Sequence, residues 1–353
     1  MILVESAARG ARLDSLARRV IEALHKPVEL DGFGPSFVLT ASIGVAFGQY
    51  ETSEDLLRDA LLAMHAAVTA GRDRYTLFNA NMRSVIEGRG VLEAELNIAL
   101  ADKQFFLLYQ PIYDLTTQKV VGLEALIRWL HPKQGVLPPA DFLPLAEETE
   151  LIVPVGRWVL EEACSRVSAW NVAGHPVGMS VKVSAHQLNR DGFATDVRRA
   201  LQQSGIAPSL LTLEIAEDTV MRDVAVAAER LKEIKQLGVR IAIDDFGSAY
   251  AHRADLQRMP LDFLKVDRSA LAASEDEDYR SWLLSAILNA GRELSLTVIV
   301  KGIETYEQMT TVKTMGCTMA QGFFMGEPTT AEAIESLFDA DFPAAPATST
   351  SAS

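Results

Sequence analysis

The sequence contains little cysteine and comparatively little positive charge. Its two cysteines, Cys164 and Cys317, are far apart and form no CxxC or Cys/His pattern, so neither a disulfide scaffold nor a structural zinc site is expected. Lys and Arg number 33 against 47 Asp and Glu, which gives a formal net charge of −14. A surface with this charge repels nucleic acid and anionic lipid. We therefore expect no nucleic acid polymer as a partner.

Long apolar runs are also absent. No stretch approaches the roughly 20 apolar residues that a membrane helix needs, and the N-terminus lacks the basic and then apolar pattern of a signal peptide. We expect no insertion into a membrane, and the scarcity of cysteine favours the reducing cytoplasm. The composition, with 48% hydrophobic and 23% charged residues, is ordinary for a globular protein and excludes collagen-like and disordered classes.

The first 82 residues predict a small α/β unit. Apolar periodicity predicts helices and strands here, the helices at about 11–25 and 53–70 and the strands at about 37–47 and 75–78. The opening Met1–Val4 has the pattern of a strand already in progress, so we expect the chain to begin inside a domain. A helix over 83–104 is predicted to connect this unit to the rest of the chain.

Short β-rich runs then alternate with helical segments over residues 105–340. The eight runs are Phe105–Asp114, Val120–Trp129, Met179–Ser184, Leu211–Glu217, Val239–Phe246, Phe263–Asp267, Thr297–Ile303 and Met319–Met325. This alternation predicts a parallel sheet, and eight runs over about 250 residues match a (β/α)8 barrel. The predicted fold class is α/β, a TIM-like (β/α)8 barrel preceded by the smaller unit. The Ala-, Pro-, Thr- and Ser-rich tail over 341–353 is expected to be disordered.

Ionisable and amide side chains lie at the end of almost every run. They are Gln110, Glu124, Arg128, Lys182, Glu214, Asp244, Asp245, Lys265, Asp267, Lys301, Glu304 and Gln321. Strands of such a barrel end at one mouth, and carboxylates that converge there raise one another's pKa unless cations lie among them. Carboxylate and amide oxygens suit Mg²⁺ or Mn²⁺, and paired ions of this kind indicate phosphodiester hydrolysis. In the alternative interpretation, Asp244 and Asp245 cap a helix and the lysines simply pair with them.

Motifs in this region resemble those of EAL-domain cyclic-di-GMP phosphodiesterases. Tyr109–Pro111 and Glu124–Trp129 resemble the family signature, and further matches follow in the family's order over about residues 88–340. They are Pro139–Glu147, Glu214–Glu217, Asp244–Gly247, Lys265–Asp267, Gly302–Glu304 and Gln321–Phe323. The 1–82 unit is similar to the C-terminal half of a GGDEF domain, through Ala41–Ala46 and Gly71–Tyr75. It lacks that domain's signature loop, so we expect a scaffold without cyclase activity, and a natural gene that begins upstream.

The resemblance implies a site that cuts one phosphodiester of cyclic-di-GMP to give linear pGpG. It implies the following roles: ligation of Mg²⁺ or Mn²⁺ by Glu124, Glu214, Asp244, Asp245 and Asp267; stabilisation of the attacking water by Lys265; ligand contacts by Gln110, Arg128 and Gln321; and organisation of the site by Glu304.

Two positions depart from the family pattern in the same way. Lys182 stands where the family has a metal-binding asparagine, and Lys301 replaces the glutamate that ligates metal and serves as base. An ammonium group has no lone pair with which to ligate a metal. Six carboxylates and three lysines give the predicted site a formal charge of −3, so the new lysines supply most of the charge that two divalent ions would bring. We expect that two metal ions do not bind, and the loop at Ala249 and His252–Arg253 also departs from the family.

Three hypotheses remain open. In the first, Lys182 and Lys301 act as built-in cations that contact the phosphates, and cyclic-di-GMP is bound but not cut. In the second, slow hydrolysis persists through one metal on Glu124, Glu214 and Asp244, or through a lysine with a lowered pKa that serves as base. In the third, the barrel binds only protein. Retention of the predicted ligand contacts favours a receptor over a scaffold, and a homodimer or a protein partner is compatible with each hypothesis.

Overall fold

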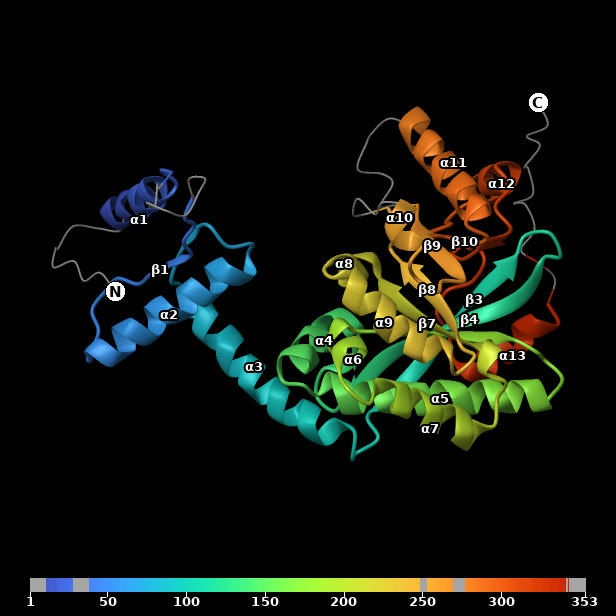
Figure 1. The fold of residues 1–353 in the computed structure, drawn as a ribbon. Helices are drawn as coiled ribbons and strands as arrows, with labels where there is room; N and C mark the ends of the chain where they lie inside the picture. Colours follow the sequence, from blue (N-terminus) through green and yellow to red (C-terminus); the bar gives the residue numbers. More distant parts are fainter. Residues whose placement is uncertain (1–10, 28–37, 248–252, 269–276, 341, 343–353) are drawn as a thin grey trace, which may run out of the picture. The chain divides into compact units, whose positions relative to one another are not determined.

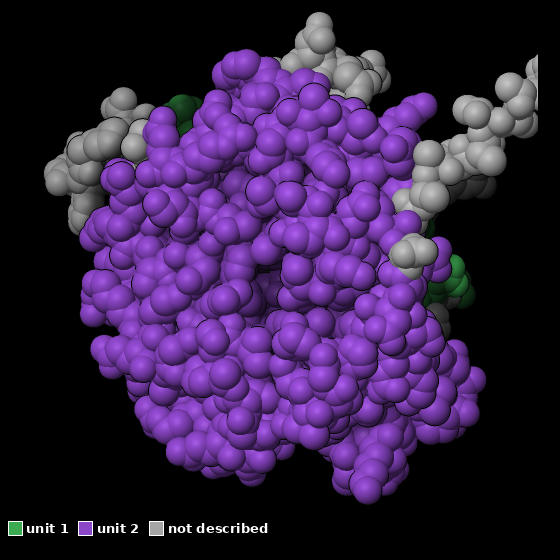
Figure 2. All heavy atoms as spheres, turned by 90° about the vertical axis from the view of Figure 1, so that its right-hand side faces the viewer, with its two compact units in different colours: residues 1–95 green, residues 96–353 purple. Residues whose placement is uncertain are grey.

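The computed structural model describes residues 11–27, 38–247, 253–268, 277–340 and 342. The chain divides into two compact units, Met1–Glu95 and Leu96–Ser353, which are coloured separately in Figure 2. The predicted opening strand, most of the predicted disordered tail, and Ala249 with His252 lie outside the described residues. In the described part of the chain, no helix is both long and apolar enough to cross a membrane.

The first unit is a small α/β arrangement. Its elements are α1 (Ala11–Leu24), β1 (Ile43–Val45), α2 (Ser53–Thr69), β2 (Tyr75–Leu77) and most of α3 (Ala80–Ala99). The two strands pair in parallel. Thr52 caps α2 by accepting a hydrogen bond from the Asp55 N–H, and Gly44 permits close packing of that helix, since a Cβ there would lie 1.9 Å from the Ala60 carbonyl oxygen. The predicted helices and strands are confirmed, although β1 is shorter than expected.

The second unit is built on a closed barrel of eight strands (Figure 1). The strands are β3 (Phe105–Asp114), β4 (Lys119–His131), β6 (Gly178–Val183), β7 (Leu211–Ala216), β8 (Arg240–Asp244), β9 (Phe263–Asp267), β10 (Thr297–Lys301) and β11 (Met319–Ala320). Pairing of β3 with both β4 and β11 closes the ring, and β5 (Gly135–Leu137) adds to β4 outside it. The predicted (β/α)8 barrel is confirmed.

The prediction of an entirely parallel sheet is wrong for one strand. β3 runs antiparallel to both of its neighbours, β4 and β11. Only four residues, 115–118, separate β3 from β4, whereas a parallel crossover needs about a dozen or more. The Asp114 carboxylate accepts hydrogen bonds from the backbone N–H groups of Thr116 and Thr117, at 2.8 and 2.7 Å, and so stabilises a tight turn instead.

Helices surround these strands and supply the apolar cover that a mostly parallel sheet needs. They are α4 (Pro139–Glu148), α5 (Ile152–Val172), α6 (Ala185–Asn189), α7 (Phe193–Ser204), α8 (Glu217–Met221), α9 (Val224–Lys235), α10 (Arg253–Leu256), α11 (Glu277–Glu293), α12 (Tyr306–Thr314) and α13 (Ala331–Phe338), with a 3₁₀ turn at Pro208–Leu210. Figure 2 shows one face of this unit, which is hollowed near its centre.

Apolar side chains fill the barrel toward the amino ends of its parallel strands. Ile112, Ala242, Phe263 and Ile299 form a buried cluster against which Val121 and Met319 pack. These side chains come from six different strands of the ring, so the interior is a packed core and not a channel. Most of the predicted site residues lie toward the opposite end, where the parallel strands terminate.

Candidate functional site

Seven of the predicted site residues form one continuous set of ion pairs at the mouth of the barrel. We call this set the mouth network, and its members are Glu124, Lys182, Glu214, Asp244, Asp245, Lys265 and Lys301. They come from β4, β6, β7, β8, the residue after β8, β9 and β10. Because the parallel strands end at the same side, side chains that are far apart in sequence meet there.

Lys265 lies at the bottom of the mouth network. Its side chain is completely buried, and Nζ lies 2.5 Å from Glu124 Oε2 and 2.5 Å from Glu214 Oε1. Burial by itself lowers the pKa of Lys265, but the carboxylates of Glu124 and Glu214 outweigh this effect and raise the pKa above its usual value. The ammonium group therefore stays charged and offsets two buried carboxylates.

The two glutamates that share Lys265 differ in their proton affinity. Burial raises the pKa of both carboxyl groups. At Glu124 the ammonium groups of Lys265 and Lys182 reverse this effect and lower the pKa to about 2. Glu214 faces the charge of Glu124 as well, and its pKa is raised to about 7. Its Oε2 is buried and has no hydrogen-bond partner among the described residues, so burial and the charge of Glu124 both disfavour the ionised form of Glu214 relative to that of Glu124.

Asp244 is the residue on which the two substituted lysines meet. Lys182 Nζ lies 2.7 Å from Asp244 Oδ2 and 3.5 Å from Glu124 Oε1. Lys301 Nζ donates to Asp244 Oδ1 and also to Asp245 Oδ1, the latter at 2.8 Å. Burial raises the pKa of Asp244, but the lysine charges outweigh it and hold the pKa below the usual range. Both oxygens of this buried carboxylate are therefore engaged by ammonium groups.

Two of the predicted ligand contacts border the mouth network. Gln321 Nε2 donates to Gln110 Oε1 at 2.8 Å and to Glu124 Oε2 at 2.9 Å, while Gln110 Nε2 donates to the Gly326 carbonyl at 3.1 Å. Gln321 is buried, and its Oε1 has no hydrogen-bond partner in the described part of the chain. The two amides are thus fixed beside Glu124.

Three further residues of the predicted site are not members of the mouth network. Arg128 NH1 donates to the Ile127 carbonyl at 2.9 Å, and Asp267 ends β9 opposite Lys301 in the sheet register. The Glu304 side chain is exposed, and its backbone N–H donates to Gln308 Oε1 at 2.7 Å. Among the described residues, neither Arg128 nor Glu304 shares a hydrogen bond or ion pair with the mouth network.

Glu217 is a structural contributor to which sequence reasoning assigned no role. It is buried at the start of α8, and its Oε2 accepts the backbone N–H of Gly247 at 3.0 Å. The Phe246 N–H donates to the Lys265 carbonyl at 2.9 Å. The chain that follows β8 is thus held to the barrel at two consecutive residues. The only sequence signal was an acidic residue three positions after Glu214, in a segment that matched the family.

The carboxylates of the mouth network do not fit a pair of divalent metal ions. Mg²⁺ or Mn²⁺ needs several free oxygen ligands in one place. Both oxygens of Asp244 and of Glu124 already face ammonium groups, and of the two glutamates only Glu214 keeps a free oxygen. The described residues contain no group of three or more His, Cys, Asp or Glu that could hold a metal ion.

This misfit predicts that divalent metal does not stabilise the protein. Since an ion that binds only the folded state adds about 2.7 kcal/mol of stability at 100 times its Kd, a bound metal would be readily detected. We expect the thermal unfolding midpoint to differ by less than about 1 °C between EDTA and Mg²⁺ or Mn²⁺ buffers. A saturable rise of several degrees in the unfolding midpoint with either ion would contradict the prediction that no divalent metal binds.

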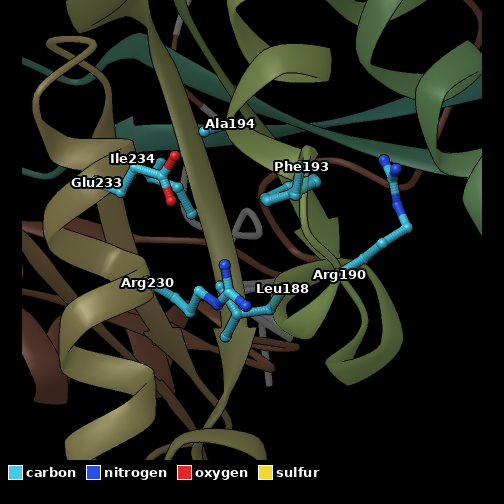
Figure 3. A pocket seen from close by; sticks show the side chains of 7 residues that line it. All are labelled: Leu188, Arg190, Phe193, Ala194, Arg230, Glu233 and Ile234. Atoms are coloured by element: carbon cyan, nitrogen blue, oxygen red, sulfur yellow. The ribbon is translucent and has the colours of Figure 1, made fainter.

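A separate hollow lies between α6, α7 and α9 (Figure 3). It is a shallow depression with essentially no enclosed room for a water molecule, and it is lined by Leu188, Arg190, Phe193, Ala194, Arg230, Glu233 and Ile234. Its two arginines are already paired, Arg190 with Asp196 and Arg230 with Asp191. The Arg190 side chain points away from Arg230 in Figure 3, so the two do not converge on an anion.

Comparison with known proteins identifies the family to which the barrel is similar. The family model described as EAL domain matches residues 93–328. The cyclic di-GMP phosphodiesterase NbdA of Pseudomonas aeruginosa is 36% identical, over 94% of this chain and 42% of its own. From the same organism, the bifunctional diguanylate cyclase/cyclic di-GMP phosphodiesterase MucR is 35% identical, over 94% of this chain and 48% of its own. The chain therefore spans less than half the length of these relatives.

Solved structures give the same result. A structure of the MucR phosphodiesterase in complex with c-di-GMP has a TM-score of 0.67 and 39% identity, and the match covers 69% of this chain and 99% of that one. The EAL domain of FimX from Pseudomonas aeruginosa bound to c-di-GMP has a TM-score of 0.61 and 25% identity, over 67% of this chain and 95% of that one.

Proposed function

Because the chain belongs to the EAL domain family, we propose that it is a receptor that binds cyclic-di-GMP without metal ions and does not cut it. Phosphodiesterases of this family generally depend on divalent metal. Related EAL domains have been solved with c-di-GMP bound. The proposed ligand is therefore the c-di-GMP that these relatives bind, but we propose that this chain does not cut it.

The observation that carries the proposal is the pairing of Asp244 with two ammonium groups. Lys182 and Lys301 each bond one of its oxygens, at positions where the resemblance implies an asparagine and a glutamate. Within the mouth network, three ammonium groups face four carboxylates. The network is close to neutral without any metal, so it does not strongly repel the phosphates of a dinucleotide.

The surrounding groups support ligand binding. A lysine ammonium is a competent phosphate partner, and Gln110 and Gln321 lie beside the network in fixed positions. Gln321 Oε1 remains available for a donor. With Arg128, the three predicted ligand contacts are all retained in the chain.

The same groups disfavour hydrolysis. A charged ammonium at Lys301 cannot accept a proton from water, so it cannot replace a glutamate as general base. Lys265 has a raised pKa and is likewise unsuited to act as a base. Loss of a positioned base costs about 10²- to 10⁴-fold in rate. Glu304, to which the resemblance assigns the organisation of the site, is exposed and does not compensate for this loss.

One observation favours slow hydrolysis as a second function. Glu214 Oε2 is a buried oxygen without a hydrogen-bond partner in the described part of the chain, and such an atom could face a single cation. The remaining oxygens around it are engaged by lysines. We therefore rank a residual phosphodiesterase below a receptor.

A calorimetric titration of cyclic-di-GMP into the purified protein tests the proposal. We expect the same affinity in EDTA and in Mg²⁺, with the ligand recovered intact by chromatography after the titration. The variant Arg128→Gln tests whether the heat comes from the predicted site. It removes one predicted ligand contact and is expected to weaken binding about tenfold. Binding only in Mg²⁺ with release of pGpG would establish an enzyme, and absence of binding in both buffers would leave a protein scaffold.

A further inference from the structure

The three lysines of the mouth network differ in their access to solvent. The side chain of Lys265 is 0% exposed, that of Lys301 is 13% exposed and that of Lys182 is 50% exposed. Lys182 is the penultimate residue of β6, where strand ends open onto the mouth. A ligand in the mouth therefore meets the Lys182 side chain, while Lys265 stays covered.

The lysines also differ in how many of their N–H donors are already used. Each ammonium group has three donors. Among the described residues, Lys265 bonds Glu124 and Glu214, and Lys301 bonds Asp244 and Asp245, whereas Lys182 makes one hydrogen bond, to Asp244. Its contact with Glu124, at 3.5 Å, is an ion pair without a hydrogen bond. Lys182 is thus the most exposed of the three and keeps the most donors for a ligand.

We infer that Lys182 is the lysine that contacts a phosphate of the bound dinucleotide, and this inference rests on the proposed function. Lys301, by contrast, is a positioning residue. A phosphate oxygen could accept from Lys182 while the bond to Asp244 persists, so binding requires no ion pair to break. The same contact by Lys301 would require a nearly buried side chain to leave one of two carboxylates.

The surroundings of Lys301 support its role as a positioning residue. Its two partners are consecutive residues, and Asp245 adopts a left-handed backbone with a φ of 53°, which costs energy for a residue other than glycine. The Asp245 N–H also donates to Asp244 Oδ1 at 2.9 Å. Lys301 thus ties β10 to the strained end of β8 and stabilises the conformation there.

The experiment compares Lys182→Met with Lys301→Met in the full chain. Each variant removes one positive charge from the mouth network, so each serves as the charge-matched control of the other. In EDTA, we expect Lys182→Met to weaken cyclic-di-GMP binding at least about tenfold more than Lys301→Met does. Conversely, we expect Lys301→Met to lower the thermal unfolding midpoint more, because it leaves the buried Asp244 and the strained Asp245 without their shared partner. A merely structural role for Lys182 would not give this opposite ranking.

A second measurement needs no variant. Lysine acetylation by an amine-reactive reagent can be followed by mass spectrometry with and without saturating cyclic-di-GMP. Because the nearby carboxylates hold the pKa of Lys182 above its usual value, the reaction is run in alkaline buffer. We expect the ligand to slow acetylation of Lys182 about tenfold there, while the nearly buried Lys301 reacts slowly in both samples. A protein that binds the ligand, but whose two variants bind equally or whose Lys182 is not protected, would overturn this inference and leave the proposed function standing. If the unaltered protein does not bind, both fail.

Discussion

Replacing Lys182 by asparagine together with Lys301 by glutamate is expected to raise metal-dependent hydrolysis of cyclic-di-GMP at least about 100-fold. The double change frees both oxygens of Asp244 from ammonium groups and returns a proton acceptor to position 301. It also restores the oxygen ligands that divalent ions prefer. The formation of pGpG, followed by chromatography in Mg²⁺, Mn²⁺ and EDTA buffers, measures the effect.

The two single variants are the controls for this prediction. Lys182→Asn leaves Lys301 on Asp244, and Lys301→Glu leaves Lys182 there, so each retains one ammonium at the place where metal would bind. We expect each single variant to gain much less than the double variant, because residues of one site act together. A double variant that takes up metal but hydrolyses no faster than the unaltered protein would show that these lysines are not what impairs catalysis.

Replacing Lys265 by methionine is expected to destabilise the protein by about 3–5 kcal/mol, the usual cost of leaving a buried charge without its partner. Lys265 is fully buried and offsets both Glu124 and Glu214. Without it, two carboxyl groups at the barrel floor face one another, and each pKa rises. Urea denaturation of the variant and the unaltered protein at pH 7 measures the difference in the free energy of unfolding.

The pH dependence of that difference provides an internal check. A carboxyl whose pKa is higher in the folded state than in the unfolded state contributes stability below its unfolded pKa and loses it as the pH rises through the folded pKa. The Lys265→Met deficit should therefore shrink from pH 8 to pH 5. Lys235→Met is the surface control, since Lys235 and Asp262 form a partly exposed pair, and it should cost about 1 kcal/mol or less. A Lys265→Met deficit as small as this control would contradict the prediction.

The sequence was sufficient to predict the barrel but not the direction of every strand. Alternation of β-rich and helical runs identifies the elements, and eight runs identify the closed ring. The period of a strand does not reveal its direction, so β3 was expected to be parallel to its neighbours. The signal that could have corrected this was the gap of four residues at 115–118, which only a turn can fill.

The sequence predicted that ionisable side chains at the strand ends would meet, but not how these side chains pair with one another. Strand ends meet at one mouth, which is why Glu124, Glu214 and Asp244 could be grouped from their positions alone. Which lysine bonds which oxygen depends on side-chain conformations that no spacing encodes. Lys182 and Lys301 looked equivalent as strand-end lysines, yet one is half exposed and the other is nearly buried. The hydrogen bond between the Gly247 N–H and Glu217 depends on how the chain folds after β8, so it could not be predicted from the sequence either.

The reversed β3 also determines where the polypeptide enters the barrel. In the register, Phe105 at the start of β3 lies opposite Trp129 near the end of β4, and Phe106 lies opposite Arg128. The residue before β3, Gln104, accepts the Leu130 N–H through its carbonyl and the Trp129 indole N–H through its side chain. The incoming chain therefore joins the rim at the carboxyl ends of the parallel strands directly, whereas eight parallel strands would have brought it in at the opposite end. Because Phe106, two residues after Gln104, pairs with Arg128 in the register, the entering chain reaches the strand that carries this predicted ligand contact without crossing the core.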